Sequence, residues 1–102
     1  MTPTAHGRNS DLMAARAEAA ALFAAAGRNE KAGPTAQLHC LAAATSLLAP
    51  RGPVPATADS TDPDRLVERA LRILGNLPAD DFAQSDILAA AQHGHRALRA
   101  PR

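Results

Sequence analysis

The sequence predicts an all-α protein in which four helices, arranged as two consecutive helical hairpins joined by a proline-rich linker, form a small bundle. Alanine, the residue with the highest helix propensity, makes up roughly a quarter of the chain. Aromatic residues, which favour strands, are limited to two phenylalanines. At 102 residues, one hydrophobic core and one domain are expected. The predicted segments are a disordered N-terminal tail (1–9), a first hairpin (10–49), the linker (50–61) and a second hairpin (62–99).

The first hairpin is defined by residues that start and stop helices. Ser10 is a suitable N-cap for a first helix from Asp11 to about residue 26, and Gly27 would end it. After a polar connection, Pro34 can occupy the first turn of a second helix that runs to about residue 49.

The second hairpin follows a linker that contains Pro50, Pro53 and Pro55. Asp62 and Pro63 form an N-cap and first-turn pair. The helix they open has one apolar face, made of Leu66, Val67, Ala70, Ile73, Leu74 and Leu77. Pro78 interrupts the chain, and a fourth helix is expected from residue 80 or 81 to about residue 98. An offset of 51 residues aligns parts of the two halves, so an internal duplication is an alternative origin of the pattern.

Charge and cysteine content bound the function classes. A net charge of +1 indicates neither a nucleic-acid binder nor a receptor for acidic ligands. The single cysteine cannot form an internal disulfide, and the N-terminal segment lacks the apolar region of a secretory signal. Nowhere does the sequence approach the ~20 consecutive apolar residues of a membrane span. We therefore expect a cytoplasmic protein.

Candidate catalytic and metal-binding residues are few. His39 and Cys40 are neighbours on a predicted helix and diverge, which argues against a nucleophile and base pair. His93 and His95 point about 200° apart on a helix, so they cannot bind one ion together. A composite site of His39 and His95 across the bundle is geometrically possible, but structural roles explain these residues better. The sequence thus predicts no enzyme, no cofactor and no metal.

Two-sided apolarity of the first two helices is the main functional signal. A helix that is apolar on two sides is usually central or shared with a partner. We therefore expect a non-catalytic protein, regulatory or accessory, that acts by protein–protein interaction or by self-association as a homodimer. The residues expected to contribute to this surface are Ala21, Ala25, Cys40, Ala43 and Leu47.

Two alternatives come from other features. Arginines are concentrated on the third helix and at the end of the fourth, which would suit a small regulator that contacts nucleic acid or another anion. These residues are Arg65, Arg69, Arg72, Arg96 and Arg99. An apolar ligand between the hairpins ranks last, because no convergent polar groups would orient it.

Overall fold

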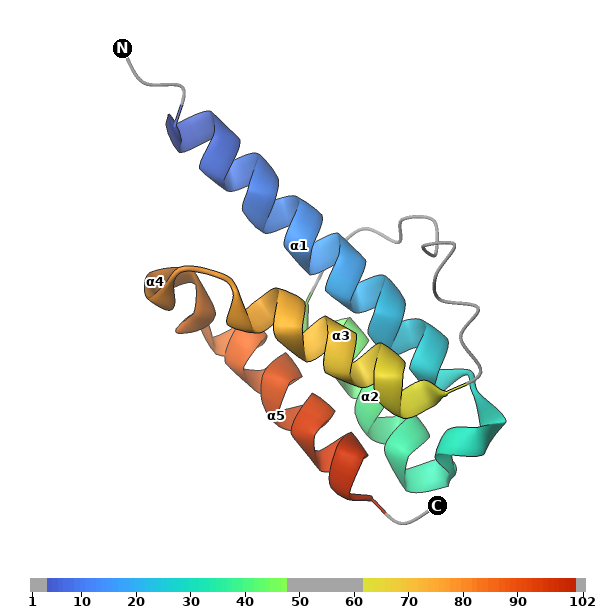
Figure 1. The fold of residues 1–102 in the computed structure, drawn as a ribbon. Coiled ribbons are helices and arrows are strands. Elements are labelled where there is room, and N and C mark those ends of the chain that lie inside the picture. Colours follow the sequence, from blue (N-terminus) through green and yellow to red (C-terminus); the bar gives the residue numbers. More distant parts are fainter. Residues whose placement is uncertain (1–3, 48–61, 101–102) are drawn as a thin grey trace.

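A computed structural model describes residues 4–47 and 62–100, and all regular structure in these two ranges is helical (Figure 1). The all-α prediction is therefore confirmed. The predicted proline-rich linker, residues 50–61, lies outside the described residues. The elements are α1 (Thr4–Gly27), the 3₁₀ helix η1 (Glu30–Ala32), α2 (Pro34–Ser46), α3 (Pro63–Gly75), α4 (Ala79–Phe82) and α5 (Ser85–Arg99).

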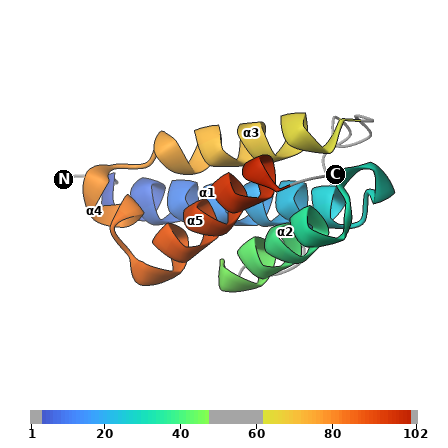
Figure 2. The ribbon, with the colours of Figure 1, turned by 90° about the horizontal axis from the view of Figure 1, so that it is seen from below.

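The long helices pack across the two halves of the chain. α1 lies against both α2 and α3, and α5 lies against both α2 and α3. Figure 2 shows α3 and α2 on opposite sides of α1. Each helix of the first half therefore has a partner helix in the second half.

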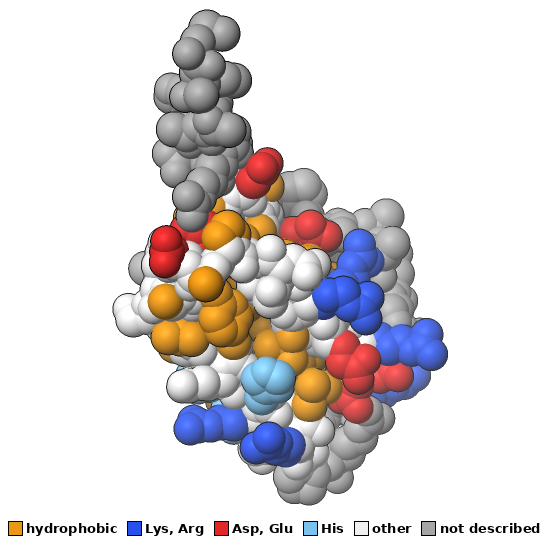
Figure 3. Space-filling view, turned by 60° about the vertical axis from the view of Figure 1, so that its left-hand side comes forward, with side chains coloured by type: hydrophobic (Ala, Val, Ile, Leu, Met, Phe, Trp, Pro, Cys, Tyr) orange, Lys and Arg blue, Asp and Glu red, His pale blue; other side chains and the backbone are white. Residues whose placement is uncertain are grey.

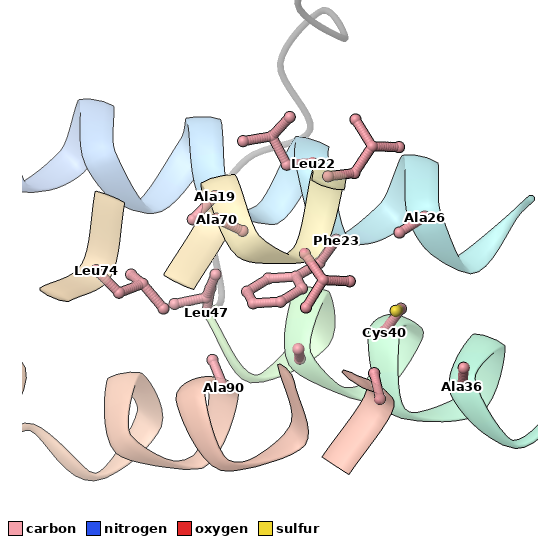
Figure 4. Close-up of a cluster of buried hydrophobic side chains, with 14 of the residues drawn as sticks. Ala19, Leu22, Phe23, Ala26, Ala36, Cys40, Leu47, Ala70, Leu74 and Ala90 are labelled. Carbon is pink, nitrogen blue, oxygen red and sulfur yellow. The ribbon is translucent and has the colours of Figure 1, made fainter. Parts of the chain in front are cut away.

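The core is built around a few large side chains. Phe23 and Leu22 of α1, Leu47 at the end of α2, Leu74 of α3 and Ile87 of α5 are all fully buried. Figure 4 shows the Phe23 ring in the middle of this cluster. Small residues fill the space between them and let the helices approach closely: Ala19, Ala26, Cys40, Ala43, Ala70 and Ala90. The apolar face predicted for the helix that follows Pro63 is confirmed, since its residues lie in this core or pack against it.

Two predicted helix boundaries were wrong. α1 begins at Thr4 rather than after Ser10, so residues 4–9, expected in a disordered tail, are helical. No proline lies between Pro3 and Pro34, so none blocks the extension of the helix from Ser10 toward the N-terminus. The expected fourth helix is divided into α4 and α5, because Gln84 has an extended backbone (φ −61°, ψ 136°) and precedes α5.

Other start signals were correct. The Asp62 carboxylate accepts a hydrogen bond from the backbone N–H of Asp64 at 3.0 Å, as an N-cap does, and Pro63 follows in the first turn. Pro34 likewise lies in the first turn of α2, where the preceding Gly33 provides no side-chain cap. Gly33, just before it, has φ 83°, a conformation that side-chain-bearing residues rarely adopt.

Candidate functional site

Three of the residues expected on an interaction surface lie in the core instead. Cys40, Ala43 and Leu47 are at most 1% exposed, so they contact the chain's own helices and not a partner. Ala21 and Ala25 are half-buried on α1. The prediction of α2's outward face was therefore wrong, because the face with smaller side chains is the one that packs closely beside Phe23 (Figure 4).

The opposite face of α2 is exposed and apolar. Leu38 is 70% exposed and Leu41 is 43% exposed. Pro34 and Thr45 are exposed on the same side, at spacings of four, three and four residues along this face. None of the thirteen residues of α2 is Asp, Glu, Lys or Arg. We call these four residues the outer face of α2.

Leu41 also explains why residue 27, the last residue of α1, is a glycine. A Cβ atom at Gly27 would lie 2.7 Å from Leu41 Cδ2. Gly27 does not have a positive φ, so glycine is needed there for close packing and not for a left-handed turn. α2 thus lies with Leu41 over the end of α1 and leaves Leu38 toward solvent.

The arginines of the nucleic-acid alternative are divided by acidic neighbours. Arg69 of α3 lies 3.6 Å from Glu18 of α1, and Arg65 lies 3.9 Å from Asp62. Arg72, Arg96 and Arg99 are exposed. On the face in Figure 3, a group of basic side chains lies directly beside acidic ones. Interleaved charges of this kind give a weaker attraction for phosphates than a continuous basic patch.

Arg16 of α1 occupies a site that the sequence did not reveal. Its Nη1 donates to the backbone oxygen of Leu47 at 2.8 Å and to Asp86 Oδ2 at 2.7 Å, while Nη2 donates to Gln84 Oε1 at 2.7 Å. The hydrogen bond from Arg16 is the main reason why the pKa of Asp86 is lowered. In the sequence, Arg16 is visible only as an arginine within an alanine-rich helix. The partners, 31 to 70 residues away, can be found only from the fold.

A histidine pair joins α2 to α5. Nδ1 of His39 and Nδ1 of His93 are 3.2 Å apart, and the ring centroids are 5.5 Å apart. Burial, followed by the neighbouring His39 and Arg96, lowers the pKa of His93 and so favours its neutral form. His95, which the sequence suggested as the partner of His39, is exposed. A histidine pair across the bundle therefore exists, but the partner of His39 is His93 and not His95.

Cys40 has none of the properties of a reactive thiol. Burial, with a smaller contribution from the negative charge of Asp64, raises the pKa of Cys40 to about 11. The thiolate is the nucleophilic form, and little of it forms at neutral pH with such a pKa. Cys40 therefore serves as a small apolar core residue.

Three further findings concern membrane spans, metal ligands and similarity to known proteins. Within residues 4–47 and 62–100, no helix combines the length and apolarity needed to cross a bilayer. In the same ranges, no three His, Cys, Asp or Glu side chains are grouped as ligands for a metal ion. Comparison with known proteins gives no match to a family model, to a curated protein or to a solved structure.

Proposed function

We propose that the protein is a non-catalytic helical module that acts by self-association through the outer face of α2. The observation that carries this proposal is the 70% exposure of Leu38 beside Leu41, on a helix without charged side chains. A leucine on a solvated helix is ordinary when isolated, but two on adjacent turns form a continuous apolar stripe. The cytoplasm is the compartment we propose, since the one cysteine forms no internal disulfide.

The spacing of the outer face suits helix-to-helix contact. Pro34, Leu38, Leu41 and Thr45 alternate by four and three residues, which is the spacing of a coiled-coil seam. A thirteen-residue helix is about 20 Å long, so the seam covers nearly all of α2.

A second copy of the chain is the occupant that this face fits best. In a two-fold dimer, the same surface of both copies meets itself, so a face whose charges were all of one sign would repel its copy. The outer face of α2 contains no charge and therefore meets its own copy without electrostatic repulsion. Leu38 and Leu41 of one copy would pack between the leucines of the other.

The association should be weak. Four leucines that become fully buried contribute at most about 1.5–3 kcal/mol each, or about 6–12 kcal/mol together. Association itself costs about 4–15 kcal/mol in lost translational and rotational freedom. The two ranges overlap, so we expect a reversible dimer that forms at micromolar or higher concentration and not a permanent one.

Sedimentation velocity across about 5 to 500 μM tests the proposal. The wild-type sedimentation coefficient should rise with concentration as the dimer forms. The double variant Leu38→Gln, Leu41→Gln should remain monomeric over the whole range. Circular dichroism should show that the variant keeps its helix content, because Leu38 is mostly exposed and Leu41 is partly exposed beside the end of α1.

Leu88→Gln is the matched control, since Leu88 is also partly exposed (37%) but lies on α5. It should dimerise as the wild type does. A wild-type chain that stays monomeric at every concentration would refute the proposal. An equal loss of dimer in the Leu88 variant would place the contact elsewhere on the molecule.

A further inference from the structure

The histidine pair is the most specific grouping of ligand-type side chains in the described part of the chain. His39 comes from α2 and His93 from α5, 54 residues apart in sequence, yet their Nδ1 atoms are 3.2 Å apart. The two helices pack directly on one another. Both rings are partly buried, so each retains access to water.

We propose that His39 and His93 form an inter-helical site for a divalent transition-metal cation, with Zn²⁺ as the ion that the geometry fits best. Imidazole nitrogen is a preferred ligand of this class of ion. The proposal is independent of self-association, because it concerns the α2–α5 contact within one copy of the chain.

The separation of the two nitrogens matches a tetrahedral site. Zn–N bonds are about 2.0–2.1 Å long, so two donors 3.2 Å apart subtend about 100–105° at the metal. The ring planes are inclined by 35°, and small rotations of the two side chains would turn both lone pairs toward a common point. Because fewer than three ligand side chains gather among the described residues, water would complete the coordination.

The metal would take the place of a shared proton. In the hydrogen-bonded pair, one ring donates from Nδ1 and the other accepts at Nδ1. For metal binding, the donor ring transfers its proton from Nδ1 to its own Nε2 through water, which leaves both Nδ1 lone pairs free. Each nitrogen then displaces one water from the hydrated ion, and no proton is released when both rings are neutral.

The surroundings of the pair affect both the protonation of His93 and the attraction of a cation. α2 has no Asp, Glu, Lys or Arg, so the charged neighbours that act on His93 are His39 itself and, with a smaller effect, Arg96 of α5. Burial first, and then these neighbours, lower the pKa of His93 and so favour its neutral ring. Arg96 would also repel the incoming metal, so we expect an affinity well below that of a structural zinc site.

Thermal unfolding with and without Zn²⁺ tests the site. A ligand that binds only the folded state stabilises it in proportion to its concentration relative to Kd. At a Zn²⁺ concentration of about four to five times Kd, the wild-type Tm should rise by about 4–8 °C. The shift should be absent in His39→Gln and in His93→Gln, each compared with itself without metal.

His95→Gln is the matched control, because His95 is exposed on the same helix and should leave the Zn²⁺-dependent shift intact. NMR of the wild type provides a second readout that needs no substitution, since Zn²⁺ should perturb the ring resonances of His39 and His93 before that of His95. No shift of Tm up to millimolar Zn²⁺ would overturn the proposal. A shift that persists in both glutamine variants would do the same.

Discussion

At the scale of single residues, Arg16 determines how three segments meet. Its guanidinium donates to the carbonyl of Leu47, which caps the end of α2, and to the Asp86 carboxylate at the start of α5, and its side chain is only 17% exposed. Hydrogen bonds to charged groups that are shielded from water contribute more than surface ion pairs. Arg16 is therefore a positioning residue that holds the end of α2 and the start of α5 against α1.

The Asp86 side of this contact predicts an acid-dependent stability. Because the pKa of Asp86 is lowered in the folded state, the unfolded chain takes up its proton at a higher pH than the folded chain. The stabilisation is complete above the unfolded pKa of about 4 and is lost as pH falls through the folded pKa. Asp86→Asn should lower the free energy of unfolding by about 1–2 kcal/mol at pH 7. This deficit should shrink between pH 5 and pH 3.

Urea unfolding of wild type and variant at pH 7, 5, 4 and 3 measures this change. Asp80→Asn, at an exposed position on α4, serves as the control and should change the unfolding free energy by less than about 0.5 kcal/mol. A deficit for Asp86→Asn that stays constant from pH 7 to pH 3 would contradict the ion-pair interpretation.

At the scale of helices, the approach of α5 to the core depends on Gly94. A Cβ atom there would lie 2.8 Å from Leu71 Cδ2 and 3.0 Å from Phe23 Cε1. Leu71 is half-buried and can move, but Phe23 is fully buried and cannot. Gly94→Ala should therefore destabilise the fold by about 1–3 kcal/mol, although alanine is the better helix former by about 1 kcal/mol.

Gly75→Ala is the matched control for this prediction. Nothing lies within 4 Å of a Cβ at Gly75, the last residue of α3. Alanine there should leave the Tm unchanged or raise it slightly, because it reduces the freedom of the unfolded chain. If both variants were equally stable in thermal unfolding, close packing at Gly94 would not be the constraint.

Some features of the helices could be predicted from local sequence patterns, and others could not. Asp62 and Pro63 mark the start of α3 through local chemistry, and one apolar face against a charged one leaves no doubt about which side of α3 is buried. α2 lacks this contrast, because both of its faces are apolar and neither is charged. Its orientation depends on the space beside Phe23, which no pattern within residues 34–46 can report.

Site residues were harder to predict for a related reason. His39 meets His93 across 54 residues, and Arg16 meets Asp86 across 70. Periodicity shows which residues share a face of one helix but not which faces of two helices come together. The sequence therefore identified His39 as a candidate and paired it with the wrong histidine.

At the scale of the whole molecule, the packing joins the two halves into one folding unit. α1 rests on α3, and α2 rests on α5, so each half of the chain covers apolar faces of the other. The buried cluster draws on both halves, with Phe23 and Leu47 from the first and Leu74 and Ile87 from the second. Neither half can exclude water from these side chains without the other.

This arrangement predicts that fragments 1–54 and 55–102 do not fold separately. Isolated helices shorter than about 12–15 residues are marginal in water, and α2 and α3 have thirteen residues each. Each fragment should show weak helical circular dichroism without a cooperative thermal transition. An equimolar mixture should regain helix and a single transition whose midpoint rises with concentration, because folding is then coupled to association. A cooperative transition in either fragment by itself would instead show that one hairpin is an independent unit, and the contacts of α1 with α3 and of α2 with α5 would then be docking contacts between folded parts.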